Sequence, residues 1–173
     1  TKVVNIDSGI DYRLEFFDHA EIYHSPLDDS ANAILEDDFI HVCPDKGDEA
    51  SILEIEDREI ETVRCGDGVV WFDFKAICAG PRGVADYIEI ARQYQTVLIA
   101  NIPVMNDNDN DVVKRLIILV DEFYDRNVKL IITAEAAPAK LYQGERLAES
   151  FKRTQSRLEE MRTHDYLAKE HLP

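Results

Sequence analysis

The sequence predicts an α/β fold, with a strand-rich acidic portion over residues 1–74 and alternating helices and strands over residues 75–173. A Gly-Asp-Gly turn at 66–68 joins two runs of apolar residues, the pattern of a β-hairpin. Further along, a stretch with helical periodicity at 112–124 lies between two compact apolar runs typical of buried strands. This alternation of helices with strands favours an α/β architecture.

The first elements are predicted from short patterns. Residues 3–16 contain VVNI and DYRLEF and suggest strands or a hairpin. LDDSANAILEDD at 27–38 is typical of a short helix capped by Asp29 or Ser30. The apolar run FIHVC at 39–43 is interpreted as a strand.

The clearest hairpin lies in ILEIEDREIETVRCGDGVVWFDF at 52–74, where the strand beginning at Val69 follows the tight turn. Within it, Trp71, Phe72 and Phe74 are expected to serve the core rather than a stacking platform. Because side chains alternate along a strand, we expect only part of this aromatic set to point inward.

The second half of the chain is predicted from its periodicity. A short helix should stop at Gly80-Pro81, and Asp86-Tyr87 should cap and pack the helix that follows. The remaining expected elements are a helix at 84–94, a buried strand at 96–105, a strand at 128–135 and a long helical pattern at 145–170.

Residues 116–126, LIILVDEFYDR, pose a particular question, because an apolar run followed by Asp-Glu can be a magnesium-binding strand of a P-loop ATPase. The apolar positions from Val112 to Tyr124 are spaced three to four apart, which predicts an amphipathic helix with Asp111 as its cap and Asn127 as its stop. We therefore expect four polar residues of this stretch to line the outer side of a helix and to pair with neighbours, with partner docking as the alternative: Asp121, Glu122, Asp125 and Arg126.

A phosphate-binding loop is also missing from this sequence. Such a loop requires GxxxxGK[ST], so that backbone N–H groups hold the phosphates and the lysine meets the β and γ oxygens. None of the seven glycines is followed by Lys-Ser or Lys-Thr.

The charge of the chain limits its partners. The net charge is −16, which disfavours a general role at nucleic acids or anionic membrane surfaces. Thirteen Asp or Glu and two basic residues lie between Asp28 and Glu61, so this segment is a solvated surface or a docking face for a basic partner. The sequence has neither a membrane-spanning apolar stretch nor a visible signal peptide, and we expect a cytoplasmic protein.

Metal-binding patterns are incomplete. The stretch 107–111 imitates an EF-hand start, but the sixth and twelfth positions of that loop would be Val112 and Ile118. His41 and Cys43 lack two further evident ligands, so we expect no metal site. The three cysteines form no CxxC pair and are expected to be reduced, semi-buried thiols.

Four segments together resemble one family. They are DYRL, VVWFDFKAICAGPRGVADYIEIARQYQTVLIANIPVM, RLIILVDEFYDRNVKLIITAEA and LYQGERLAESFKRTQSRLEEMRTHDYLAKEH. This set is similar to the C-terminal part of the ZapE-type AAA+ ATPases, bacterial cell-division proteins whose mitochondrial relatives are called ATPase family gene one. The resemblance covers most of residues 69–171 and is weaker before them.

The resemblance implies that residues 1–173 form one C-terminal fragment and contribute the C-terminal part of an AAA+ type core. In this family the P-loop, the magnesium-binding acids, the first sensor and the arginine finger all precede the DYR segment. ATP and Mg²⁺ are therefore expected in the parent protein, whereas this chain should bind neither and should not hydrolyse ATP. Partners would be proteins, including division machinery, and the parent would form homo-oligomers and reach membranes only through partners.

AAA+ proteins commonly place an arginine from the C-terminal region near the γ-phosphate, where its permanent charge stabilises the transferring phosphoryl group. In FKRTQSRLEEM, Arg153 and Arg157 lie four residues apart and share a helix face. We hypothesise that Arg157, or next Arg153, is a nucleotide sensor. The alternative is surface ion pairing with acids such as Glu149 or Glu160.

Two further alternatives remain open at this stage. Arg82 could bind an anion, although a role in a turn and helix start is favoured. The whole chain could instead be a non-enzymatic interaction module that uses the acidic 28–61 segment as its contact surface.

Overall fold

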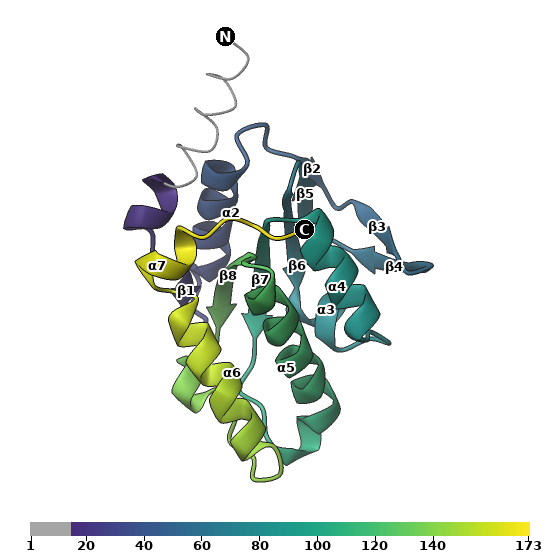
Figure 1. Cartoon of the computed structure of the whole chain (residues 1–173), viewed down its shortest axis with the longest axis vertical. Coiled ribbons are helices and arrows are strands. Elements are labelled where there is room, and N and C mark those ends of the chain that lie inside the picture. Colours follow the sequence, from purple (N-terminus) through teal and green to yellow (C-terminus); the bar gives the residue numbers. More distant parts are fainter. Residues whose placement is uncertain (1–14) are drawn as a thin grey trace.

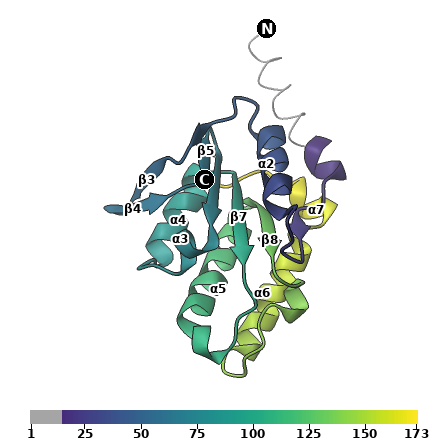
Figure 2. The same cartoon turned by 180° about the vertical axis from the view of Figure 1, so that it is seen from behind.

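The computed structural model describes residues 15–173 and contains a six-stranded sheet beside a separate two-stranded hairpin (Figures 1 and 2). The strands, in chain order, are β1 (Tyr23–His24), β2 (Asp48–Glu49), β3 (Ile52–Ile55), β4 (Arg58–Glu61), β5 (Arg64–Gly66), β6 (Val69–Asp73), β7 (Thr96–Ile102) and β8 (Lys129–Ala134). The helices are α2 (Ala31–Val42), α3 (Phe74–Cys78), α4 (Val84–Gln93), α5 (Asn110–Asp125), α6 (Ala148–Glu160) and α7 (His164–Leu167). Two 3₁₀ turns cover Asp107–Asp109 and Pro138–Lys140.

The large sheet has the order β1-β8-β7-β6-β5-β2. Its first four strands are parallel, while β5 and β2 are antiparallel to their neighbours. Helix α2 packs on one face, and α3, α4, α5 and α6 cover the other (Figures 1 and 2). The predicted α/β class, with a hairpin before alternating helices and strands, is confirmed.

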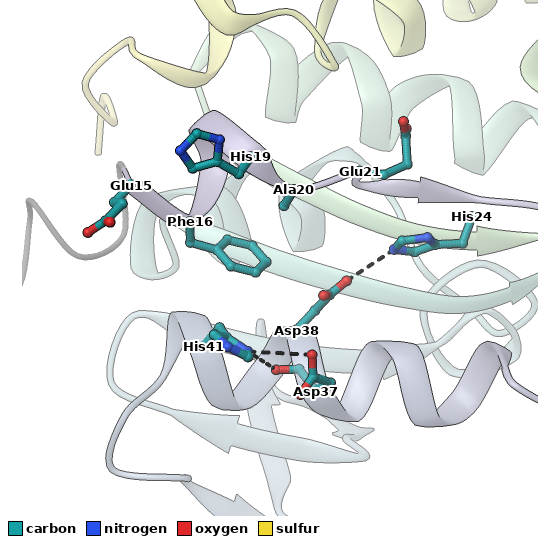
Figure 3. Close-up of a pocket in the computed structure, with 9 residues that line it drawn as sticks. All are labelled: Glu15, Phe16, His19, Ala20, Glu21, His24, Asp37, Asp38 and His41. Atoms are coloured by element: carbon teal, nitrogen blue, oxygen red, sulfur yellow. Dashed lines mark hydrogen bonds and ion pairs between the residues drawn. The ribbon is translucent and has the colours of Figure 1, made fainter.

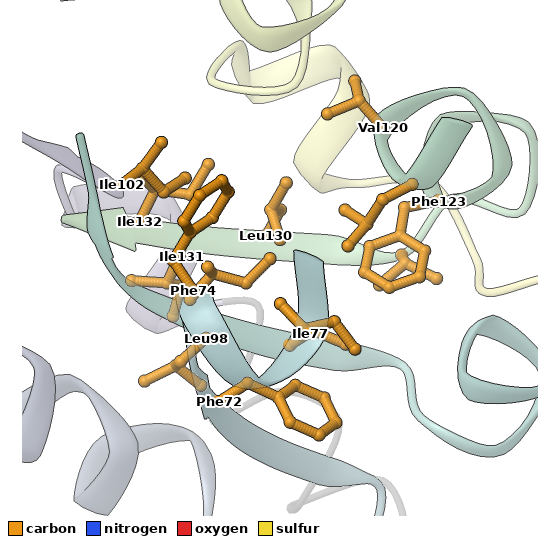
Figure 4. Close-up of a cluster of buried hydrophobic side chains, with 14 of the residues drawn as sticks. Phe72, Phe74, Ile77, Leu98, Ile102, Val120, Phe123, Leu130, Ile131 and Ile132 are labelled. Atoms are coloured by element: carbon orange, nitrogen blue, oxygen red, sulfur yellow. The ribbon is translucent and has the colours of Figure 1, made fainter. Parts of the chain in front are cut away.

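Both faces of the parallel strands are buried. All six residues of β8 and the first four of β6 are buried, because helices cover the sheet from both sides. Phe72, Leu98 and Phe123 belong to the cluster of buried hydrophobic side chains that forms this core (Figure 4). Trp71, Phe72 and Phe74 are all buried, so the expectation that only part of this aromatic set points inward is wrong.

The predicted strand at 39–43 is wrong, since these residues continue α2 to Val42. Leu35, Phe39 and Val42 are fully buried at spacings of four and three, which continues one helical stripe into the sheet. Ser30 occupies the N-cap position, as one of the two predicted caps. Its side chain does not cap the helix, because its hydroxyl donates to the carboxylate of Asp28 at 2.6 Å.

The strands expected at 3–16 fall largely outside the described residues. Within the described part, residues 15–19 are helical, so Glu15 and Phe16 contradict that prediction. Phe17 of this turn is buried against the core, which explains why an apolar pattern there does not require a strand.

The predicted hairpin is confirmed as β5 and β6, with Gly66 paired to Val69 across the two-residue turn. Gly68 has φ +73°, a conformation that glycine adopts without steric cost. A second hairpin, β3–β4, turns at Glu56-Asp57, and both residues have positive φ. Its turn carries no glycine or asparagine, so only the apolar alternation of its strands could be recognised in advance.

Several predictions of the second half are confirmed. LIILVDEFYDR belongs to helix α5, and the elements expected near 84–94, 96–105 and 128–135 are α4, β7 and β8. Helix α5 starts at Asn110, slightly before the predicted cap at Asp111. The sulfur atoms of Cys43, Cys65 and Cys78 are not joined by disulfide bonds to one another. Within residues 15–173, no helix is long and apolar enough to cross a membrane.

Candidate functional site on helix α6

Helix α6 carries both arginines that the sequence singles out. Its apolar stripe, Phe151, Thr154 and Leu158, is buried at spacings of three and four and fixes which side of the helix faces the protein. The Phe151 ring packs 5.5 Å from the ring of Tyr142, measured between centroids, and α6 lies against α5. The arginines therefore occupy defined positions on a packed helix.

Arg157 is held by helix α5. Its guanidinium forms an ion pair with the carboxylate of Asp121 and lies 4.8 Å from the centroid of the Tyr124 ring. The side chains of Arg157 and Asp121 are only 17% and 30% exposed, so solvent screens this pair less than an open surface pair. The predicted surface pairing of Arg157 is right in kind, but its partner is Asp121 rather than Glu149 or Glu160.

An aromatic stack extends this contact towards the sheet. The Tyr124 and Tyr166 rings are stacked with centroids 5.8 Å apart, and the Tyr166 hydroxyl donates to the carbonyl of Val128 at 2.7 Å. The Tyr124 hydroxyl donates to Glu160, and this hydrogen bond is the main reason that the pKa of Tyr124 is raised. Together these contacts join α5, α6 and α7.

Arg153 has a different environment, although it lies one turn before Arg157 on the same helix. It is exposed and has no hydrogen bond or ion pair to any residue in 15–173. Its neighbour Lys152 pairs with Glu149 at 3.3 Å, so the nearest acid on this turn serves a different cation. Arg153 is thus an available positive charge on a helix whose position Arg157 helps to fix.

The loop before α6 is anchored by Asp107. Its carboxylate accepts hydrogen bonds from the backbone N–H groups of Glu145 and Arg146 at 3.0–3.1 Å and from the Tyr142 hydroxyl at 2.9 Å. The bond from Arg146 is the largest cause of the lowered pKa of Asp107, followed by the bond from Glu145. A Cβ on Gly144 would lie 2.3 Å from the Tyr142 hydroxyl, so this position needs a residue without a side chain.

The carboxyl ends of the parallel strands form a second polar cluster, at the edge where open α/β sheets commonly bind ligands. Asn101 has φ +67° at a bulge in β7. Its side-chain amide donates to Asp73 at 2.8 Å, and its backbone N–H donates to the Thr133 hydroxyl at 3.0 Å. Glu135 accepts from the backbone N–H of Val104 at 2.7 Å. These groups bond to one another, and the two carboxylates repel an anionic ligand.

Arg82 has the structural role that the sequence favours. Its guanidinium donates to the carbonyls of Ala76 and Glu59 at 3.2 Å, which ties the β3–β4 hairpin to α3. Arg58 completes this link through Asp86, which is 1% exposed and also accepts from the Gly83 backbone at the start of α4. Neither arginine is available as an anion-binding site.

The described residues do not fit a complete site for ATP and Mg²⁺. Asp121 lies on a helix and is neutralised by Arg157, so it does not offer a free carboxylate to a cation. In the chain from residue 15 onward, no group of three or more His, Cys, Asp or Glu side chains is arranged to hold a metal ion.

Comparison with known proteins identifies the family. The family model described as AFG1-like ATPase matches residues 1–170. The chain belongs to the AFG1-like ATPase family. It is 37% identical over 170 residues to the cell division protein ZapE of Escherichia coli K12, an alignment that covers 98% of this chain and 45% of that protein. It is 27% identical over 200 residues to lactation elevated protein 1 homolog B of Danio rerio, covering 95% of this chain and 40% of the relative.

This AFG1-like chain thus spans slightly less than half the length of the curated relatives that it matches. No solved structure matches it. The resemblance to the C-terminal part of ZapE-type proteins is confirmed. The identity values do not distinguish Arg153 from Arg157, so the choice between them depends on their geometry.

Proposed function

We propose that this chain is the C-terminal part of a ZapE-like AAA+ ATPase that couples hydrolysis of ATP, with Mg²⁺, to remodelling of protein partners in cell division. The family relation over almost the whole chain supports this proposal. The chain by itself lacks GxxxxGK[ST], so the groups that hold the phosphates would lie in another part of the parent. We expect the isolated chain to be inactive.

Arg153 is the residue that we assign to the nucleotide, because it is exposed and has no partner within residues 15–173. An arginine placed beside the γ-phosphate stabilises the charge that spreads over the phosphoryl oxygens during transfer. Arg157 is already neutralised by Asp121, so its use as a sensor would require that ion pair to break. The order of the two candidates is therefore the reverse of the one favoured by the sequence alone.

Arg157 then serves as a positioning residue. Its contacts with Asp121 and Tyr124 fix the rotation of α6 against α5 and so fix the direction in which Arg153 projects. Because ATPases of this kind assemble as oligomers, the phosphate that Arg153 meets belongs either to the same parent chain or to a neighbouring copy. The acidic surface, with its net charge of −16, supports protein partners rather than nucleic acid, and a cytoplasmic setting.

Steady-state ATPase kinetics of the parent protein test this assignment. Arg153→Ala should lower kcat by about a hundredfold, the usual effect of removing one donor to a developing charge. Arg153→Lys should recover only part of the rate, because lysine lacks the planar fork of donors. Lys152→Ala is the matched control, an exposed cation on the same turn, and should retain the wild-type rate.

The opposite pattern of ATPase rates would refute the assignment of Arg153 as the nucleotide sensor. If Arg153→Ala retained the ATPase rate while Arg157→Ala lost it in a fully folded protein, Arg157 would be the sensor despite its ion pair.

The coding sequence upstream of Thr1 gives a simpler test of the whole proposal. A GxxxxGK[ST] motif there supports the ATPase, whereas an in-frame start at this point favours the non-enzymatic interaction module with an acidic docking surface.

A further inference from the structure

A cavity of about 480 Å³ lies between the helical segment 15–19, strand β1 and helix α2 (Figure 3). It is far in sequence from helix α6 and takes no part in the proposed handling of ATP. Phe16 extends from the first of these elements toward the side chains of α2, and His24 projects from β1 toward Asp38. Three separate elements therefore build one pocket.

The charged groups of this pocket are mostly acidic. Glu15, Glu21, Asp37 and Asp38 line it, and no lysine or arginine among residues 15–173 does. Asp38 is bonded to His24 at 3.1 Å, and Asp37 lies 3.6 Å from His41. Of the four acids, only Glu21 has an arginine partner in the described chain, Arg162 at 2.7 Å. A cation that enters the pocket would meet three carboxylates, those of Glu15, Asp37 and Asp38, that have no lysine or arginine partner among the described residues.

The pocket also has an aromatic wall, formed by two of its lining residues, Phe16 and His41. The rings of Phe16 and His41 are stacked, with centroids 5.6 Å apart and planes inclined by 23°. A guanidinium is planar, stacks on aromatic faces and bonds carboxylates with paired donors, whereas an ammonium group acts as a point charge. The combination of aromatic wall and carboxylates therefore fits arginine better than lysine.

The position of the pocket at the sheet edge indicates how such a side chain would arrive. β1 pairs only with β8, so its other edge has no strand partner within residues 15–173. An unpaired edge offers backbone groups to an extended peptide, whose alternate side chains then enter neighbouring pockets. Glu21 lies just before β1 and His24 belongs to it, and both residues line the pocket.

We propose that this pocket, formed by residues 15–24 and 37–41, binds an arginine side chain presented by an extended segment of a partner protein. The inference does not depend on ATP hydrolysis, because binding is a property of this chain and can be measured on it. It also gives the acidic 28–61 segment a specific contact point, since Asp37 and Asp38 belong to both.

The direct test is a titration of the 173-residue chain with acetyl-Ala-Arg-Arg-Arg-Ala-amide, followed by backbone NMR at low salt. Saturable shifts should concentrate at residues 15–24 and 37–41. Matched peptides with lysine or with neutral citrulline separate the stacking and charge contributions. The lysine peptide should bind about fivefold more weakly, and the citrulline peptide should not bind measurably.

Paired variants with equal charge change distinguish the pocket from general acidity. Glu15→Gln with Asp37→Asn alters two exposed pocket acids and should weaken the arginine peptide about tenfold. Asp57→Asn with Glu59→Gln makes the same charge change on the exposed β3–β4 hairpin and should change binding less than twofold. Phe16→Leu should reduce the preference for arginine over lysine.

Three results would overturn the proposal. Equal weakening by the pocket and hairpin variants would mean that only long-range charge attracts the peptide. Equal affinity for arginine and lysine peptides would show that the aromatic wall does not select a guanidinium. An absence of shifts at 15–24 and 37–41, with the chain folded, would show that this pocket does not accept a peptide arginine.

Discussion

The guanidinium of Arg157 lies over the Tyr124 ring while it forms an ion pair with Asp121, one turn before Tyr124 on α5. Both contacts come from the same face of α5, so they hold α6 in one rotational setting. Thr154 lies between the two arginines in sequence, and its side chain is fully buried against the protein. Arg153 consequently points to solvent, and its direction depends on the contacts that Arg157 makes.

Breaking this ion pair should destabilise the fold measurably. Asp121→Ala leaves the mostly buried guanidinium of Arg157 without its acid, and we expect the free energy of unfolding to fall by about 1–2 kcal/mol. The control is Glu149→Ala, which breaks the exposed pair with Lys152 and should cost less than about 0.5 kcal/mol. Urea unfolding of the purified chain measures both. Equal losses would mean that Arg157 is no better anchored than a surface residue.

Because Asp107 anchors the loop before α6, we expect a substitution of Gly144 in this loop to lower the stability of the chain. Gly144→Ala places a Cβ 2.3 Å from the Tyr142 hydroxyl and 2.7 Å from Asp107, so the bonds between these residues must shift. We expect a loss of about 1–3 kcal/mol of stability. Gly83→Ala is a suitable comparison, because a Cβ there meets nothing within 4 Å. If both substitutions have the same small effect in thermal unfolding, the Asp107 anchor does not constrain the loop.

The β3–β4 turn can be improved by substitution. Glu56 and Asp57 have φ +51° and +61°, values that asparagine and glycine adopt more readily than acidic residues. Glu56→Asn with Asp57→Gly should therefore raise the free energy of unfolding by about 0.5–1 kcal/mol. The same pair of residues placed at Glu54-Ile55, inside strand β3, should destabilise the chain instead. A lower denaturation midpoint for the turn variant would contradict the observed turn geometry.

The buried tyrosines predict how stability changes at alkaline pH. Burial is the main cause of the raised pKa of Tyr87, whose hydroxyl also donates to the carbonyl of Ile77 at 2.8 Å. Above about pH 10 the unfolded chain loses this proton while the folded chain keeps it, so the free energy of unfolding falls as pH rises. Tyr87→Phe removes one such proton and should make the fall shallower by about 1.4 kcal/mol per pH unit.

At neutral pH the same variant should lose about 1 kcal/mol, because its hydrogen bond is gone. Phe72→Leu is the control, since it lowers stability without removing a titrating group and should keep the wild-type slope. Chemical unfolding at pH 7 and at several values from 9 to 11 measures the slopes. An unchanged slope for Tyr87→Phe would show that this hydroxyl titrates equally in both states.

The spacing of apolar residues was sufficient to predict those elements whose buried residues repeat with a single helical or strand period. Helix α5 follows from the spacing of Val113, Leu116, Val120 and Phe123, and its amphipathic pattern overrides the likeness of LIILVDEF to a strand. The segment 39–43 was mistaken because four apolar residues among five look like a strand when taken alone. Only Leu35, from the preceding stretch, reveals that Phe39 and Val42 belong to its helical stripe.

The candidate sites depend on contacts that one sequence does not contain. Arg153 and Arg157 were recognisable as a pair, but their difference comes from Asp121, which lies 36 residues away along the chain. The arginine pocket likewise brings Phe16 next to His41 and His24 next to Asp38. The prediction that residues 39–43 form a strand separated His41 from Asp37 and Asp38, so the common face of these side chains was not apparent.

If the groups that hold the phosphates lie in another part of the parent protein, as proposed, this chain should have no nucleotide site of its own. Calorimetric titration of the 173-residue chain with magnesium and a non-hydrolysable ATP analogue tests it most directly. We predict no saturable heat of binding, because the chain lacks a phosphate-binding loop and an arranged metal site within residues 15–173. Saturable binding in the micromolar range would contradict the account and would place a nucleotide site within this chain.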